Sequence, residues 1–284
     1  MDTRCDLHTH SFFSDGTCAP EDIVRLAVQL GLTHVALTDH NTVLGLDRFL
    51  QAAENQPLHA IPGVELSCSW QGKEIHMLGL DLPRETFPLV HQSIQEMHRK
   101  KDECNRLLVH SLRQHGYDLS YEALCRRTPE GHFNRAHVAQ MMLEKGYVSS
   151  VAEAVQGILS PKAGLYKPPE RLDALHAVRF LRSIGAVPVL AHPFLSLTEA
   201  DMHLFLPLAK DAGLSGMETR YPLYDDKTAH TAACMARQYG LLESGGSDFH
   251  GTIKPHISLG TGTGSLLVPS AFAQLLFPTR AIGP

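Results

Sequence analysis

The sequence predicts an α/β barrel interrupted by a helical insertion. Short apolar segments alternate with amphipathic helical patterns before residue 83 and again after residue 169, and this rhythm is typical of parallel strands. Histidines and acidic residues stand at or just beyond the ends of the apolar segments, where a βα-barrel carries its chemistry. A chain of 284 residues is long enough for one barrel with a modest insertion. We therefore expect a barrel domain of residues 1–82 and 170–284, with residues 83–169 forming an insertion that covers the candidate active site.

The composition is typical of a globular protein outside the membrane. Apolar residues make up 43% of the chain and charged residues 19%, and no stretch approaches the roughly eighteen consecutive apolar residues of a membrane helix. The first residues lack the apolar core of a signal peptide, so we expect a cytoplasmic protein without a membrane partner. The net charge of -5 offers no broad basic face for a long duplex nucleic acid.

The chain before residue 83 predicts strands and helices in alternation. Proline at the first helical position and acidic residues in the first turn place a helix start at Pro20. A turn at Gln71-Gly72-Lys73 predicts a hairpin that brings Glu65 and His76 together. The expected elements are strands at 5–10, 34–38, 60–65 and 74–80 and helices at 20–30 and 44–55.

The pattern changes between residues 83 and 169, where four helical segments follow one another without a convincing strand. The barrel rhythm then resumes, and the glycine- and proline-rich tail from Thr252 is expected to wrap the outside of the barrel. The expected helices are 87–113, 121–127, 135–145, 151–158 and 170–184, and the expected strands are 186–191, 215–219 and 241–244.

Two histidines near the start of the chain begin the candidate site. Side chains alternate between the faces of a strand, so His8 and His10 point the same way and can converge on one divalent ion. Such a pair alone is a weak signal, but further metal-ligating residue types follow it in order. They lie in Ser14-Asp15-Gly16, Thr38-Asp39-His40, Gly63-Val64-Glu65, Glu74-Ile75-His76, Ala191-His192-Pro193 and Ser247-Asp248-Phe249-His250.

This ordered set resembles the PHP (polymerase and histidinol phosphatase) family of metal-dependent phosphoesterases over nearly the whole chain. It looks most like the branch of nucleoside 3',5'-bisphosphate phosphatases and 5'-to-3' exoribonucleases. The resemblance implies a distorted (βα)7-type barrel that hydrolyses a phosphate monoester of a small metabolite, above all a nucleotide, by means of a metal-bound hydroxide. The alternatives are a histidinol-phosphate-type phosphatase, a short-RNA 5'-3' exonuclease and, from another class, a non-catalytic metal-binding regulatory module.

The same resemblance implies two to three divalent ions. Mixed imidazole and carboxylate ligands suit manganese, with iron or zinc as alternatives, better than calcium or magnesium. Catalytic roles fall to His40, to Glu65 as a bridging ligand, and to Asp39 as a partner that orients an imidazole. The matching motifs assign His8, His10, Glu65 and Asp248 to one ion, Glu65, His76 and His192 to a second, and Asp15, His40 and His250 to a third.

A second anion pocket is expected beside the metals. The segment Phe133-Asn134-Arg135-Ala136-His137 resembles the family's R-x-H segment for binding substrate phosphate. Arg135 and His137 lie at a predicted helix start, where backbone N–H groups are free to face an anion, and an arginine fork matches phosphate geometry. Lys101, Lys162 and Tyr166 are expected to complete this pocket for a nucleotide or a short oligonucleotide.

Overall fold

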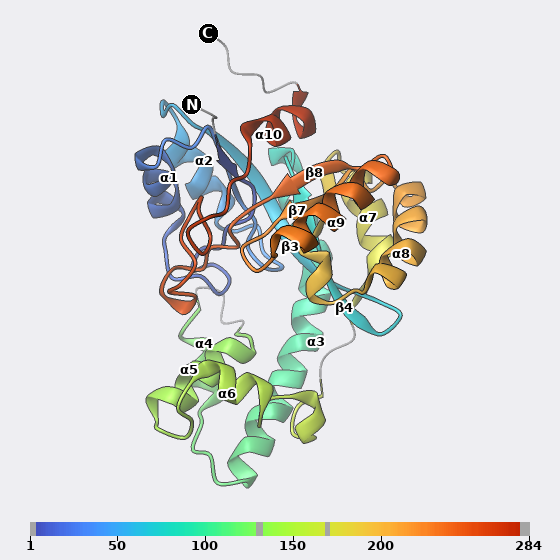
Figure 1. Ribbon diagram of the computed structural model, residues 1–284. Coiled ribbons are helices and arrows are strands. Elements are labelled where there is room, and N and C mark those ends of the chain that lie inside the picture. The colour runs from blue at the N-terminus through green and yellow to red at the C-terminus, as the bar shows by residue number, and fades with distance from the viewer. Residues whose placement is uncertain (1–3, 129–132, 168–170, 279–284) are drawn as a thin grey trace.

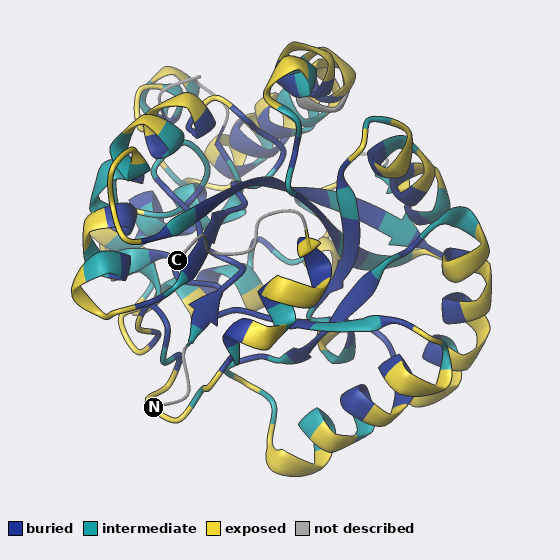
Figure 2. Cartoon of the chain, turned by 90° about the horizontal axis from the view of Figure 1, so that it is seen from above, coloured by how far each residue is buried: buried dark blue, intermediate teal, exposed yellow. Residues whose placement is uncertain are grey.

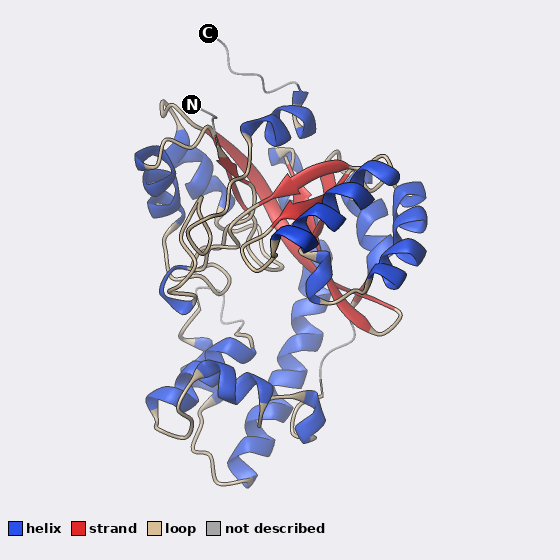
Figure 3. Ribbon diagram, viewed as in Figure 1, coloured by secondary structure: helices blue, strands red, loops and turns tan. Residues whose placement is uncertain are grey.

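The computed structural model describes residues 4–128, 133–167 and 171–278. They form a nearly closed barrel with a group of helices at one end, which confirms the predicted fold class (Figures 1 and 3). No helix among the described residues is both long enough and apolar enough to span a membrane.

The barrel wall follows the strand order β1-β2-β3-β4-β6-β7-β8, with β5 beside β3. Its ends nearly meet, because the Leu7 N–H donates to the Gly245 carbonyl at 3.1 Å and the Asp248 N–H to the His8 carbonyl at 2.9 Å. The strands are β1 (Cys5–Asp6), β2 (His34–Leu37), β3 (His59–Trp70), β4 (Lys73–Leu80), β5 (Leu172–Asp173), β6 (Val187–Ala191), β7 (Gly216–Arg220) and β8 (Leu242–Gly245).

Strand β4 runs antiparallel to both of its neighbours, β3 and β6. The predicted hairpin is therefore confirmed, with Ser67 of β3 opposite His76 of β4. The expectation that every motif of the site follows the end of a strand is wrong for His76, which lies near the start of β4. Because β4 runs in the opposite direction, its first residues share an edge with the last residues of the other strands. His76 thus lies at the same end of the barrel as the other candidate ligands.

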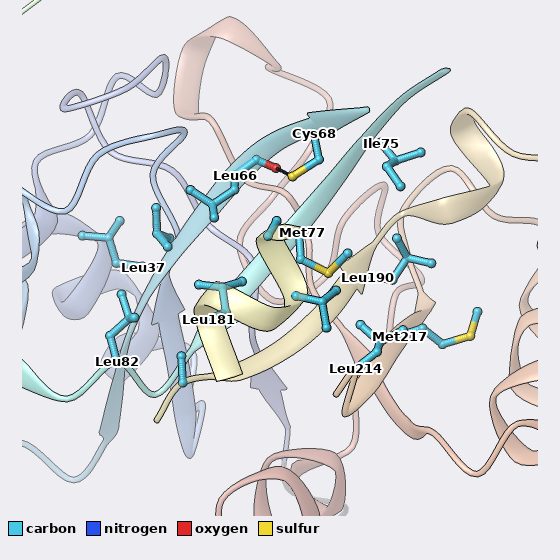
Figure 4. Close-up of a cluster of buried hydrophobic side chains, with 14 of the residues drawn as sticks. Leu37, Leu66, Cys68, Ile75, Met77, Leu82, Leu181, Leu190, Leu214 and Met217 are labelled. Carbon is cyan, nitrogen blue, oxygen red and sulfur yellow. Dashed lines mark hydrogen bonds between the residues drawn. The ribbon is translucent and has the colours of Figure 1, made fainter. Parts of the chain in front are cut away.

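Side chains of the strands alternate between two cores. Val35 and Leu37 belong to the core shared with the outer helices, whereas Ala36 belongs to the cluster inside the barrel. Figure 2 shows the buried strands ringed by helices whose exposed faces point outward. Figure 4 shows Leu181 of α7 beside the sheet, where a Cβ at Gly79 would overlap it. The outer helices are α1 (Pro20–Gln29), α2 (Leu46–Ala53), α7 (Ala174–Ser183), α8 (Glu199–Ala212) and α9 (Asp226–Gln238), with short 3-10 turns η1 (Arg84–Thr86), η3 (Pro193–Leu195) and η4 (Gly251–Ile253).

The C-terminal tail was expected to wrap the outside of the barrel. Instead, it closes one end of the barrel. Helix α10 (Ser270–Leu276) packs Ala273 and Leu276 into the inner cluster with Cys5, Leu80 and Val189. The pattern of apolar residues in this tail did not predict that α10 would pack against the inner cluster. Helix α10 lies at the end of the barrel opposite the insertion (Figure 1), so the other end remains available for the site.

The insertion has a core of its own and shares one long helix with the barrel. In α3 (Phe87–Gln114), Ile94 packs in the barrel core and Leu108 packs in the insertion core. The remaining helices are α4 (Tyr121–Cys125), α5 (Arg135–Glu144) and α6 (Val151–Gln156), followed by the 3-10 turn η2 (Pro161–Ala163). The predicted helices are thus confirmed, with ends shifted by a residue or two. The boundary expected at 169–170 lies outside the described residues and stays a prediction.

The packing of α10 against the inner cluster predicts that substitutions of two adjacent leucines have different effects on the free energy of unfolding. Leu276 is 5% exposed inside the barrel end, whereas Leu275 is 62% exposed. Leu276→Ala should lower the free energy of unfolding by about 2 to 4 kcal/mol, because it leaves a cavity. The matched control Leu275→Ala should change it by less than about 0.5 kcal/mol. Equilibrium urea denaturation measures both, and equal effects would contradict the packing described for α10.

Candidate active site

A fully buried carboxylate, Glu65 of β3, lies at the centre of the candidate site. Both of its oxygens face imidazole nitrogens, so the side chain of one residue contacts histidines from four separate parts of the chain. Oε1 lies 2.8 Å from His76 Nδ1 and 3.0 Å from His192 Nε2, and Oε2 lies 3.0 Å from His40 Nδ1, 3.2 Å from His8 Nε2 and 3.3 Å from His10 Nε2.

Two aspartates extend the cluster to either side of His10. Asp248 Oδ1 lies 3.1 Å from His10 Nε2, and Asp15 Oδ1 lies 3.1 Å from His250 Nε2. The His10 and His250 rings stack with their centroids 4.1 Å apart. The structure therefore brings every predicted metal ligand together. Strand β1 ends at Asp6, so His8 and His10 come from the extended segment after it and not from the strand itself.

Several atoms of this cluster are buried without a hydrogen-bond partner. A buried polar atom without a partner is costly and rare, so such atoms point to a missing positive group. They are His8 Nε2, both ring nitrogens of His10, Asp15 Oδ1, His40 Nδ1 and Glu65 Oε2. The donor set of imidazoles and carboxylates fits divalent transition metals.

Three groups of ligand atoms in the described chain are compact enough to hold a metal ion, with all atoms of a group within 4.8 Å of one another. The grouping differs from the family-based assignment, since His10 joins the Asp15 group, His40 also joins Glu65 and His76, and the predicted ligands His192 and Asp248 belong to none of the three groups. The groups are His8, His10 and Glu65; His40, Glu65 and His76; and His10, Asp15, His40 and His250.

The electrostatics of the cluster follow from burial and close charges. Burial lowers the pKa of His40 to about 3, which leaves it neutral as a metal ligand must be. Burial also disfavours protonation of His10 and His76, but the carboxylates around them raise the pKa of His10 to about 9 and of His76 to about 10. Burial would raise the pKa of Glu65, yet its imidazole neighbours hold that pKa well below its usual value. Metal ions would therefore have to displace protons from His10 and His76.

Side chains that were not predicted from the sequence hold the ligands in place. Glu218 of β7 is fully buried, with Oε1 2.9 Å from His8 Nδ1 and Oε2 accepting the His192 N–H at 2.6 Å. On the outer side, Tyr221 Oη and Lys254 Nζ donate to Asp248 Oδ2 at 2.8 and 2.7 Å. Glu218 also stands near the end of a predicted strand, so the signal used for the ligands could have found it.

Asp39 does not orient an imidazole, contrary to the expectation. Its Oδ1 accepts the Ser11 N–H and the Ser14 hydroxyl, both at 2.7 Å, and its Oδ2 accepts the Ser11 hydroxyl at 2.6 Å. The carboxylate is therefore occupied by the loop that leads to Asp15. The position of Asp39 next to His40 in the sequence therefore did not identify its partners, which are Ser11 and Ser14.

A cavity of about 270 Å³ opens beside the cluster, between the barrel and the insertion. Of the predicted substrate-binding residues, Lys101, Arg135 and Tyr166 line it. Lys162 is exposed on η2 outside it, and His137 instead pairs with Asn134 at the start of α5. The lining also includes Asn134, from the predicted phosphate-binding segment, and four residues that were not predicted, namely Asn41, Ser67, Asn105 and Arg171.

Fold and site together define an α/β barrel with a buried histidine and carboxylate cluster of the kind that binds divalent metals. The PHP domain family model matches residues 6–164, which is more than half of the chain. The chain belongs to the PHP family.

Relatives and solved structures agree with this membership. The 5'-3' exoribonuclease Rnm of Escherichia coli K12 is 30% identical over 90% of this chain and 87% of the relative. The 3',5'-nucleoside bisphosphate phosphatase of Chromobacterium violaceum is 29% identical over 86% of each chain. An amidohydrolase structure from the same organism, with bound sulfate and no metal, has a TM-score of 0.83 at 26% identity and covers 97% of this chain and 96% of the other.

The unpaired buried ligand atoms predict stabilisation by metal. Adding Mn²⁺ to the metal-free protein at one hundred times the dissociation constant should raise the melting temperature by about 5 to 10 °C per ion. Ca²⁺ at the same concentration should do much less, because it prefers oxygen ligands over imidazole. Differential scanning calorimetry measures both shifts. The absence of a shift with Mn²⁺, Fe²⁺ and Zn²⁺ would count against a metal site.

Proposed function

We propose that this chain is a metal-dependent phosphatase that releases phosphate from a small phosphorylated metabolite, a nucleoside 3',5'-bisphosphate above all. The main support for the proposal is a cavity directly beside the buried cluster, whose lining includes three cationic side chains as well as the carboxylates of Asp15 and Glu74. His40 and His76 form one side of that cavity, and Lys101, Arg135 and Arg171 contribute positive charge to its lining. The E. coli and C. violaceum relatives, named for RNA and nucleotide substrates, support this substrate class.

The ligand groups would hold two to three ions, for which we propose manganese. When bound, the ions lower the pKa of a water and offset the charge of the transferring phosphoryl group. Glu65, His10 and His40 each contribute to two of the three groups, and the two oxygens of the Glu65 carboxylate make Glu65 the residue best suited to join two ions. Glu218 fixes the His8 ring so that Nε2 faces the cluster, and Asp39 orders the loop that carries Asp15. A cytoplasmic location stays a prediction.

The cavity residues hold the part of the substrate that does not react. Lys101 lies at the barrel side of α3, and burial lowers the pKa of its ammonium while the nearby Asp15 and Glu74 carboxylates raise it. The Arg135 guanidinium stacks over Tyr166 with its Cζ 5.1 Å from the ring centroid. Together these cations suit a second phosphate near the metals.

A 5'-3' exonuclease acting on short RNA is the second candidate, favoured by the relative named 5'-3' exoribonuclease Rnm. A cavity of about 270 Å³ is of a size that suits the end of a single strand better than a duplex. A histidinol-phosphate-type phosphatase would use the same ligand cluster. The complete set of ligands argues against a non-catalytic regulatory module.

The joining role of Glu65 predicts that Glu65→Gln reduces the turnover of adenosine 3',5'-bisphosphate by at least about a thousandfold. A neutral amide cannot hold two cations as a carboxylate does. The circular dichroism spectrum should match that of the wild type. Glu243→Gln is the matched control, since Glu243 accepts a hydrogen bond from Thr219 outside the cluster, and it should retain wild-type turnover. Wild-type turnover of Glu65→Gln with full metal occupancy would rule out this role.

The position of Arg135 in the cavity predicts a selective effect on substrate binding. Arg135→Ala should raise the KM for adenosine 3',5'-bisphosphate by one to two powers of ten, about the worth of one charged hydrogen bond. Its effect on p-nitrophenyl phosphate, which has no second phosphate, should be far smaller. Lys162→Ala, outside the cavity, serves as the control and should change neither KM. An equal loss on both substrates would place Arg135 at the transferring phosphate instead.

A further inference from the structure

The insertion reaches the buried cluster through the side chain of Asn134. Asn134 Nδ2 donates to Asp15 Oδ2 at 2.9 Å, across the junction between the insertion and the barrel. The other oxygen, Asp15 Oδ1, is buried without a hydrogen-bond partner and lies 3.1 Å from His250 Nε2. Asn134 therefore determines which oxygen of Asp15 faces the group of His10, His40 and His250.

The amide of Asn134 is held in this orientation by the helix it begins. Its Oδ1 accepts the His137 N–H at 3.2 Å, and its own N–H donates to His137 Nδ1 at 3.2 Å, which forms a capping box at the start of α5. With the carbonyl oxygen turned toward the helix, the NH₂ group is turned toward Asp15. Any movement of the start of α5 would move this contact as well.

The neighbours of Asn134 belong to the cavity wall. Arg135 lines the cavity, and the Phe133 carbonyl accepts a hydrogen bond from Asn105 Nδ2 at 2.8 Å. Asn105 is buried in α3 and also lines the cavity. Three consecutive residues thus make three different contacts: Phe133 binds the buried Asn105, Asn134 binds Asp15, and Arg135 lines the cavity.

We propose that Asn134 is a positioning residue that couples phosphate binding in the cavity to metal binding by Asp15. A phosphate held by Arg135 fixes the start of α5, and Asn134 then presents Asp15 Oδ1 to the ion. Because such coupling is reciprocal, a phosphate ligand in the cavity strengthens metal binding by the same factor by which the metal strengthens ligand binding. The inference rests on the proposed function of this site and adds a means by which the insertion regulates it.

Two variants separate the contact to Asp15 from the helix cap. Asn134→Ser keeps a good cap residue, but its shorter side chain cannot also reach Asp15. Ser150→Ala removes the cap of α6, where Ser150 Oγ accepts the Glu153 N–H at 3.1 Å, far in sequence from any predicted ligand. Isothermal titration of the metal-free proteins with Mn²⁺ should show one binding step weakened about tenfold or more in Asn134→Ser and none weakened in Ser150→Ala. Unchanged Mn²⁺ binding in Asn134→Ser, or an equal loss in Ser150→Ala, would overturn the role of Asn134.

The coupling itself is tested by repeating the titration with AMP, which retains one phosphate after cleavage of a 3',5'-bisphosphate. AMP should raise the Mn²⁺ affinity of the wild type and leave that of Asn134→Ser unchanged. An equal increase in both proteins, or none in the wild type, would overturn the coupling. The Mn²⁺ result does not depend on turnover, so a protein that shows the Asn134 effect but hydrolyses no phosphomonoester would refute the proposed function alone.

Discussion

The buried charge of Glu65 is the constraint on which the structure of the site depends. A carboxylate without solvent needs positive or hydrogen-bonding neighbours on both oxygens, because an uncompensated buried charge is strongly destabilising. The β3–β4 hairpin places His76 beside it, barrel closure places His8 and His10, and β6 delivers His192. The strands that place these histidines pack around the inner core, and α10 completes this core at the opposite end of the barrel.

The barrel and the insertion contribute different chemistry to the same site. The barrel supplies the histidines and carboxylates of the cluster, whereas α3 and α5 supply Lys101 and Arg135 to the cavity. A chain with a net charge of -5 can therefore bind an anion, because the positive charge is local and partly enclosed. The Asn134 contact to Asp15 makes the two parts dependent on each other.

The fold class and the metal-ligating residues could be predicted from the sequence, because both depend on local sequence patterns. Most of the histidines stand just beyond the ends of apolar segments, with His76 near the start of β4 as the exception. Proline, glycine and turn residues mark the helices of the insertion. The sequence could not predict contacts that depend on three-dimensional packing. Helix α10 packs Ala273 and Leu276 into the inner cluster, Asp39 accepts hydrogen bonds from a loop distant in sequence, and Lys162 is exposed on η2. Asn134 reaches Asp15 across more than one hundred positions of the chain.

Anomalous diffraction from crystals soaked in Mn²⁺ would show whether the buried cluster around Glu65 binds metal, because it locates the ions among the side chains. We expect one anomalous peak within bonding distance of Glu65, between His8 and His10, and another beside Asp15 and His250. Peaks confined to surface carboxylates, with the Glu65 cluster empty at full Mn²⁺ concentration, would contradict this expectation.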